Sequence, residues 1–406
     1  MYHVTEADNT SRASCPRAPT HPLVAIAVAL ATTAMMNPPI ATHNLAAPIT
    51  ALAACPVPEP SSSEHLIAAG GTDHLSLVAA RPPNHLSQKP IALNHAGPLD
   101  ALAWGHDANA VEHHLAAFSA GTFTLHRFRA GGAGDSISTA TELDASMRAR
   151  SACFLQQPGK LALTGDGCAC VVVTLDGSAN TDANTRRIPL ASPGVSVRAH
   201  AREPHQLMVA QEEGQLHFVD LRAPSARPSL SRSVPLGDAD AGGLYEADWS
   251  PIDLYQVGGV CGGRWLLWDL RFAGSASPPQ HVGDAHPGGG TAFKFAPMTP
   301  RTFATAGTGG EVLVHTLAPA TADVVVAGGA HPFHASHASW APAPTRLGHD
   351  LPTRVAALSW LHAGDAMPML AGAADSKVCL WAAGAQQGGA AVGALGGVEQ
   401  QPMALM

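Results

Sequence analysis

Short apolar segments recur along this chain and are separated by turns rich in glycine, proline and acidic residues. The clearest set lies in 245–272, where the segments YEADW, LYQVGGV and RWLLWD are joined by the turns SPID and CGG. Each segment is too short for a typical helix and is bounded by turn residues, so the pattern predicts three consecutive β-strands. The third predicted strand ends on Trp268 and Asp269.

Units with the same order of strands and turns occur before and after this stretch. The predicted first strands end near Trp104, Phe154, His200, Trp249, Phe295 and Trp360, and the predicted third strands end near Phe128, Val173, Val219, Trp268, His315 and Trp381. Most steps in both series are 45–50 residues, and the last is about 66 because of an insert at about 320–350. Two series that keep the same step predict a repeat architecture. Six clear units and an irregular first unit, which begins at HLIAAGG (65–71), make seven.

Repeats of this length, in which an aromatic-acid pair ends the third strand, are typical of the blades of a WD40 β-propeller. We therefore predict an all-β fold, a single seven-bladed WD40-type β-propeller over 64–384. An irregular Pro/Ala/Ser-rich segment (1–63) precedes it, and a flexible Gly/Ala-rich tail (385–406) follows it. We expect the aromatic signature residues to fill the space between blades and the acidic ones to anchor tight turns. The signature residues are Trp104, Phe154, Asp220, Trp249, Trp265, Trp268, Asp269, Phe295, Trp360, Asp375 and Trp381.

The two ends of the chain leave the closure of the ring open. If Tyr2–Ala7 forms the first strand of the first blade, the outer strand of the last blade has to come from the C-terminal tail. Leu23–Met36 is an apolar run that is shorter than the ~20 residues a membrane-spanning helix needs. Because Glu6 and Asp8 lie upstream of it, we favour a strand or a disordered segment over a secretory signal.

Composition excludes several functional classes. Charged residues make up 13% of the chain, the net charge is −8, and no block of lysine and arginine occurs, which argues against a surface for nucleic acid or for an anionic membrane. The seven cysteines form an odd set without disulfide-framework spacing, which favours a reducing compartment. The sequence contains no nucleophile-elbow, zinc-protease or P-loop motif. We therefore predict no catalytic residue, no cofactor and no small-molecule substrate.

The twenty-two histidines raise the question of a metal site, and the densest group is His331, His334 and His337. The spacing HxxH would place two ligands on one face of a helix. Pro332 and the neighbouring glycine and serine residues instead favour an irregular loop, and no acidic or cysteine ligand lies nearby. The sequence therefore predicts no metal ligand here.

Three consecutive predicted blades carry a more specific likeness. The pieces are PGVSV (193–197), LMVA (207–210), VGGVCGGRWLLWDL (257–270) and RTFATAG (301–307), in unbroken order. Together they resemble the nucleoporin 37 family, the small WD40-repeat propellers of the outer-ring scaffold of the nuclear pore complex. The segments 65–71 and 95–104 are similar to the first two blades of that family.

This resemblance implies a non-enzymatic structural subunit. Its partners would be the large scaffold nucleoporin of the Y-shaped complex and other outer-ring nucleoporins, with no direct contact to nucleic acid and no membrane span. Its role would be to support nucleocytoplasmic transport of protein and mRNA. Its location would be the nucleus, at the nuclear pore complexes of the nuclear envelope.

Two arginines keep an alternative open. The endings Asp220-Leu221-Arg222 and Asp269-Leu270-Arg271 lie in consecutive predicted blades. Paired endings of this type resemble those of WD40 substrate receptors of cullin-4-type ubiquitin ligases, in which the arginine helps to engage the adaptor. In that reading Arg222 and Arg271 are adaptor contacts. A generic WD40 adaptor is the other alternative.

Overall fold

The fold was analysed in a computed structural model of the chain. The structure describes residues 37–57, 64–81, 84–89, 93, 97–106, 112–129, 137–142, 147–175, 185–223, 228–233, 243–272, 278–317, 344–348, 353–361 and 368–383. These residues form strands and connecting turns, with no helix among them. The predicted strand at Tyr2–Ala7, the apolar run Leu23–Met36, the histidine group at 331–337 and the C-terminal tail lie outside the described residues.

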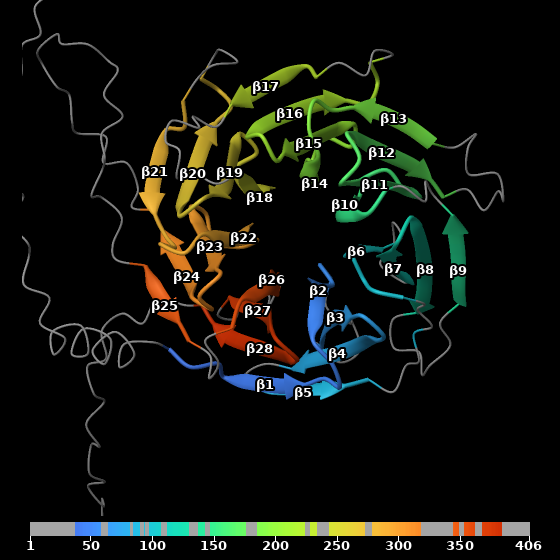
Figure 1. Cartoon of the computed structure of the whole chain (residues 1–406), viewed down its shortest axis with the longest axis vertical. Coiled ribbons are helices and arrows are strands. Elements are labelled where there is room, and N and C mark those ends of the chain that lie inside the picture. Colours follow the sequence, from blue (N-terminus) through green and yellow to red (C-terminus); the bar gives the residue numbers. More distant parts are fainter. Residues whose placement is uncertain are drawn as a thin grey trace, which may run out of the picture. The chain divides into compact units, whose positions relative to one another are not determined.

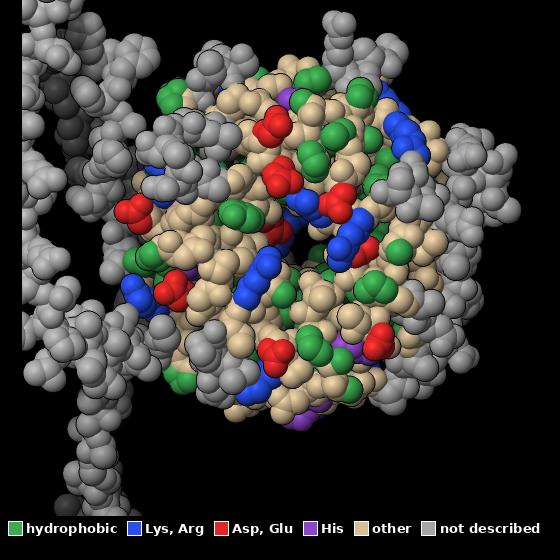
Figure 2. Space-filling view, in the orientation of Figure 1, with side chains coloured by type: hydrophobic (Ala, Val, Ile, Leu, Met, Phe, Trp, Pro, Cys, Tyr) green, Lys and Arg blue, Asp and Glu red, His purple; other side chains and the backbone are tan. Residues whose placement is uncertain are grey.

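The strands form seven four-stranded antiparallel sheets arranged as a ring around a central opening (Figures 1 and 2). The predicted all-β, seven-bladed propeller is thus confirmed. Blade 1 contains β2 (Ile49–Ala54), β3 (His65–Gly71), β4 (Leu75–Arg81) and β5 (His85–Gln88). Blade 2 contains β6 (Ala101–His106), β7 (Glu112–Ser119), β8 (Thr122–Arg129) and β9 (Ile137–Glu142), and blade 3 contains β10 (Ala149–Phe154), β11 (Lys160–Gly165), β12 (Ala169–Thr174) and β13 (Thr185–Pro189).

The remaining four blades repeat the same order from the inner to the outer strand. Blade 4 contains β14 (Gly194–Ala199), β15 (Gln206–Gln211), β16 (Gln215–Asp220) and β17 (Leu230–Ser233), and blade 5 contains β18 (Leu244–Trp249), β19 (Gln256–Cys261), β20 (Arg264–Asp269) and β21 (His281–Asp284). Blade 6 contains β22 (Gly290–Phe295), β23 (Thr302–Gly307), β24 (Val312–Thr316) and β25 (Thr345–Leu347). Blade 7 contains β26 (Val355–Leu361), β27 (Met369–Ala374), β28 (Lys377–Ala382) and, as its outer strand, β1 (Ala41–Asn44).

Strand β1 closes the ring. It pairs antiparallel with β28, from Ala41 opposite Leu380 to Asn44 opposite Lys377. The chain then turns directly into β2, the inner strand of blade 1, and the backbone nitrogen of Ile49 donates to the carbonyl of Asp375 at 2.7 Å. The outer strand of blade 7 therefore comes from residues 41–44, and the alternative of an outer strand from the C-terminal tail, which a first strand at Tyr2–Ala7 would have required, does not apply. The described propeller also begins before residue 64, because β1 and β2 lie within the segment expected to be irregular.

The predicted insert at about 320–350 also ends in a strand. Strand β25 (Thr345–Leu347) pairs with β24 and completes blade 6. On the other side of β25, the backbone nitrogen of Asn37 donates to the carbonyl of Arg346 at 3.0 Å. The segment that closes blade 7 is thus also hydrogen-bonded to blade 6.

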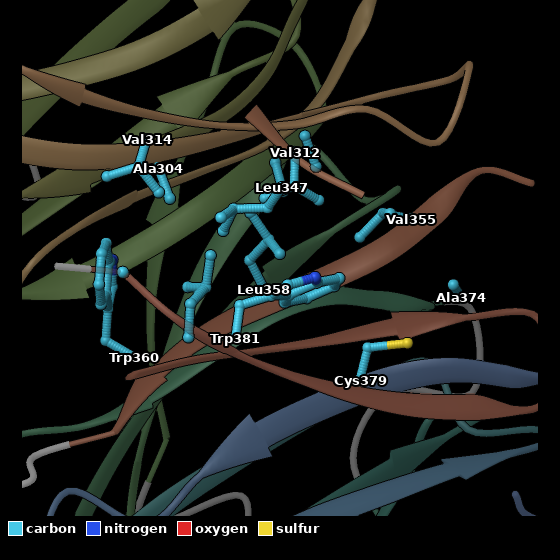
Figure 3. Close-up of a cluster of buried hydrophobic side chains, with 14 of the residues drawn as sticks. Ala304, Val312, Val314, Leu347, Val355, Leu358, Trp360, Ala374, Cys379 and Trp381 are labelled. Carbon is cyan, nitrogen blue, oxygen red and sulfur yellow. The ribbon is translucent and has the colours of Figure 1, made fainter. Parts of the chain in front are cut away.

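The apolar core of the propeller is divided among the blade interfaces. The buried apolar side chains form seven clusters, and each cluster joins two neighbouring blades. Figure 3 shows the cluster between blades 6 and 7, where Val312, Leu347, Leu358 and Trp381 meet. Because each sheet is covered on both faces, its central strands are buried along their length rather than at alternate residues, as in β23 and β27, whose residues are all buried.

Candidate functional site

The aromatic signature residues lie in the blade interfaces. The inner-strand residues Trp104, Phe154, Trp249, Phe295 and Trp360 all pack toward the preceding blade. The indole nitrogens of Trp104 and Trp360 donate to the carbonyls of Ala53 and Lys294 in those preceding blades, at 2.8 and 3.0 Å. On the third strands, Trp268 faces blade 4, Trp265 faces blade 6 with its ring 5.2 Å from that of Phe303, and Trp381 packs between blades 6 and 7.

A cavity of about 410 Å³ occupies the centre of the ring and is lined by the inner strands of all seven blades. Six of these strands carry a β-bulge at their second residue. The bulged residues all line the cavity, since a bulge changes the direction in which a side chain points. They are Thr50, Arg150, Val195, Tyr245, Thr291 and Ala356. None of these six residues was predicted from the sequence.

The cavity wall is chemically asymmetric. Blades 7, 1 and 2 contribute mainly small apolar residues and one charged residue, Asp100, whereas blades 3 to 6 contribute the charged residues Arg150, Arg198, Glu246 and Lys294. Acidic and basic side chains surround the opening in Figure 2. The neighbouring side chains of Arg198 and Glu246 are only 17% and 19% exposed, so their charges need partners close by.

These partners come from adjacent inner strands. Arg198 on β14 donates to Oε1 of Glu246 at 2.7 Å and to Oδ1 of Asp248 at 3.0 Å, both on β18. Lys294 on β22 also donates to Oε1 of Glu246. Burial alone would raise the pKa of Glu246, but Lys294 and Arg198 outweigh it and leave that pKa lowered. The four charged groups thus form a mutually paired network across blades 4, 5 and 6.

The network also satisfies the open edges of the inner strands. The backbone nitrogens of Phe293 and Phe295 on β22 donate to Oε2 of Glu246 and Oδ2 of Asp248, each at 2.9 Å. Serine hydroxyls have the same function in other blades: Ser196 accepts from the backbone nitrogen of Ala247, and Ser359 accepts from that of Ala54. Because an inner strand has a sheet neighbour on one side only, these side chains replace the missing strand. The arrangement joins neighbouring blades, and each of its charged groups has hydrogen-bond partners within it.

A second polar cluster is buried in blade 6. His286 lies 3.2 Å from Oε2 of Glu311 through Nδ1 and 2.9 Å from Oγ1 of Thr305 through Nε2. Thr305 Oγ1 is also 3.1 Å from Nε2 of His315, on β24. Burial lowers the pKa of His315 to about 3, so its ring is neutral. His315 has the register position that Trp268 and Trp381 have in blades 5 and 7.

The paired endings of blades 4 and 5 have the same geometry. The backbone nitrogens of Arg222 and Arg271 donate to the carboxylates of Asp220 and Asp269, each at 2.9 Å, and both guanidinium groups fold back onto the same carboxylates. The hydrogen bonds from Arg222 lower the pKa of Asp220 to about 2. Both arginine side chains are 59% exposed. Asp375, by contrast, lies in the turn between β27 and β28 with a φ of 53°.

The described residues contain no group of three or more histidine, cysteine, aspartate or glutamate side chains placed to hold a metal ion. Six cysteines, at 55, 153, 168, 170, 261 and 379, are free thiols. In the part of the chain that the structure describes, no helix is long and apolar enough to cross a membrane.

These features define a WD40-type β-propeller with seven blades that is closed by an N-terminal strand. No protein-family model matches the chain. The chain is 32% identical over 154 residues to nucleoporin Nup37 of Homo sapiens, and the identity to nucleoporin Nup37 of Mus musculus is the same. In both comparisons the matched residues cover 38% of this chain and 42% of the relative. Nucleoporin Nup37 of Drosophila melanogaster is 26% identical over 137 residues, or 34% of this chain and 39% of the relative.

The predicted resemblance to the nucleoporin 37 family is thereby confirmed. The matched stretch spans about two fifths of the length of the curated relatives. The nucleoporin relatives point to a structural protein rather than an enzyme.

Proposed function

We propose that this protein is a structural subunit of the nuclear pore complex whose propeller docks on a large scaffold nucleoporin in the Y-shaped outer-ring complex. The observation that carries the proposal is the similarity to nucleoporin Nup37 of three animals, in a chain that forms a closed seven-bladed ring. The similarity also supports the predicted location in the nucleus, at the pores of the nuclear envelope. By serving as part of this scaffold, the protein supports transport of protein and mRNA.

The chemistry of the central cavity is consistent with a role without catalysis. The charged groups Arg198, Glu246, Asp248 and Lys294 on blades 4 to 6 are paired with one another. A catalytic acid or base needs a proton that it can exchange with a bound substrate. We therefore propose that these groups hold the blades together.

Affinity capture of the tagged full-length chain from nuclear-envelope extracts tests the proposal. Scaffold nucleoporins of the outer ring are the expected partners. Recovery of cullin-4 and its adaptor without these nucleoporins would overturn the proposal.

The ubiquitin-ligase reading is the second candidate, because Arg222 and Arg271 are exposed at the same point of consecutive blades. An Arg222→Ala variant distinguishes the two. In the ligase reading it weakens capture of the adaptor, whereas in the proposed function it leaves the recovery of scaffold nucleoporins unchanged.

A further inference from the structure

Three large side chains are exposed together on one end of blade 5. Tyr255, which precedes β19, is 54% exposed, and Phe272, which follows β20, is 57% exposed. Arg271 precedes Phe272 in the chain, and its guanidinium carbon is 5.5 Å from the centre of the Tyr255 ring. We name these three residues the blade 5 platform. Tyr255 and Phe272 are two of only five large hydrophobic side chains that are exposed among the described residues.

The backbone beneath the platform is held in place by several hydrogen bonds. The nitrogen of Leu270 donates to the carbonyl of Tyr255 at 2.7 Å, and the nitrogen of Phe272 donates to the carbonyl of Asp269 at 3.3 Å. Arg232, a buried residue on the outer strand of blade 4, donates to the carbonyl of Phe272 at 2.8 Å. The side chain of Arg271 is fixed against Asp269. Because these backbone segments are already fixed, binding of a partner here costs little conformational entropy of the protein, which favours affinity.

The repeat shows that the fold does not require aromatic rings at these positions. In each of five blades, the residue one position before the second strand accepts a backbone hydrogen bond from the end of the third strand, and these residues are Gly159, His205, Tyr255, Arg301 and Pro368. Of these five residues, only Tyr255 of blade 5 has a large apolar ring, whereas His205 of blade 4 has a smaller, polar imidazole. Blade 4 has Ala223 where blade 5 has Phe272, after the matching Asp220-Leu221-Arg222 turn. Blade 4 thus forms the same turn without large apolar side chains.

We propose that the blade 5 platform is the docking surface for the protein partner, and that the partner presents an apolar side chain to the two rings and a carboxylate to Arg271. Tyrosine and arginine are enriched among the residues that dominate binding energy at protein interfaces. A guanidinium group offers only donors, and a carboxylate is its strongest acceptor. The two exposed rings and the neighbouring Arg271 therefore suit a partner whose surface carries both apolar and acidic side chains.

Tyr245 and the blade 5 platform lie at opposite ends of blade 5 and so on opposite faces of the ring. Tyr245, at the start of β18, lines the cavity and is 48% exposed, whereas Tyr255 lies beyond the other end of the same strand. Two tyrosines of one blade, with similar exposure, therefore report on the two faces. Tyr245 is the matched control for Tyr255.

This inference rests on the proposed function, so the test measures recovery of outer-ring scaffold nucleoporins by the tagged full-length chain. The test variants are the double variant Tyr255→His/Phe272→Ala, which gives blade 5 the residues of blade 4, and Arg271→Gln. Each should lower recovery by about tenfold or more, as loss of dominant interface residues does. Tyr245→Ala should keep recovery within about twofold. An unchanged melting temperature of each variant shows that the ring is intact.

Normal recovery with either test variant would overturn the platform and leave the proposed function standing. Loss of recovery with Tyr245→Ala alone would place docking on the face of the ring opposite the platform and would also overturn the platform. Failure of the unaltered chain to recover any scaffold nucleoporin would overturn the proposed function itself. The three failures are therefore distinguishable.

Discussion

Arg198 of blade 4 and Asp248 of blade 5 join two inner strands across the wall of the central cavity, with 3.0 Å between Nε and Oδ1. Both are the fifth residue of their strand, as is Lys294 in blade 6, so basic, acidic and basic groups follow one another around the ring. Glu246 lies between them and accepts from both cations. The charges therefore connect the inner strands of three neighbouring blades.

Replacing Glu246 should destabilise the propeller strongly. Glu246→Ala leaves Arg198, Lys294 and the backbone nitrogen of Phe293 without their shared acceptor. Removing one partner of a buried ion pair costs about 3–5 kcal/mol of the free energy of unfolding. Urea unfolding of the purified chain measures this change.

Glu212→Ala is the control for Glu246→Ala. Glu212 pairs with Arg150 at 3.0 Å, but its side chain is 50% exposed. Exposed ion pairs contribute about 0–1 kcal/mol, so the free energy of unfolding of Glu212→Ala should be close to that of the unaltered chain. An equal decrease in the free energy of unfolding of Glu246→Ala and Glu212→Ala would show that the cavity network does not hold the blades together.

Acid should weaken blade 6 through His315. A histidine in an unfolded chain has a pKa of about 6.5, whereas burial lowers the pKa of His315 to about 3 in the folded protein. Between pH 6.5 and about pH 3, His315 therefore binds a proton more readily in the unfolded chain than in the folded protein. The stability that depends on neutral His315 is complete above pH 6.5 and falls as the pH drops toward 3.

A His315→Gln variant isolates this contribution. The free energy of unfolding of the unaltered chain should fall with pH more steeply than that of the variant, by about 1.4 kcal/mol per pH unit between pH 6 and 4. Chemical unfolding at a series of pH values gives both slopes. Parallel slopes would mean that His315 does not stay neutral in the folded state.

Trp268→Ala should open a cavity between blades 4 and 5. Trp268 is 1% exposed and packs with Met208 and Phe218 of blade 4. Truncating a buried tryptophan costs about 3–5 kcal/mol. Phe272→Ala, an exposed aromatic residue of the same blade, should change stability by no more than about 0.5 kcal/mol. Thermal unfolding of the two variants provides the comparison, and similar melting temperatures would contradict the assigned interface.

The blades could be predicted from the sequence because large aromatic residues such as Trp249, Trp268 and Trp381 recur with the repeat. Trp268 and Trp381 are buried at the same place on the third strands of their blades, and Trp249 is buried at the end of an inner strand, so packing imposes the spacing. Ring closure could not be predicted, because β1 (ATHN) is short and polar and alternates between half-buried and exposed residues. Its partner β28 lies more than three hundred residues away along the chain.

The cavity network was missed for a different reason. Charged residues within a predicted strand, such as Arg198 and Lys294, have the appearance of solvent-facing positions. Their pairing depends on the β-bulges and on the side-by-side placement of three inner strands, which only the closed ring brings about. The blade 5 platform likewise becomes visible only when equivalent turns are compared by their hydrogen bonds.

Removal of β1 should destabilise the whole ring. A chain lacking residues 1–45 loses the outer strand of blade 7 and exposes the edge of β28. We expect a lower melting temperature and a less cooperative transition than in a chain lacking residues 1–36 only. The difference between the two truncations reports the contribution of residues 37–45. Identical unfolding curves would contradict closure by this segment.

Live imaging of the fluorescently tagged protein at its native expression level tests the central claim most directly. A subunit of the nuclear pore scaffold should give a punctate rim that follows the nuclear envelope and coincides with outer-ring nucleoporins. A diffuse cytoplasmic or nucleoplasmic signal, with no enrichment at the rim, would contradict the assignment of this propeller to the nuclear pore.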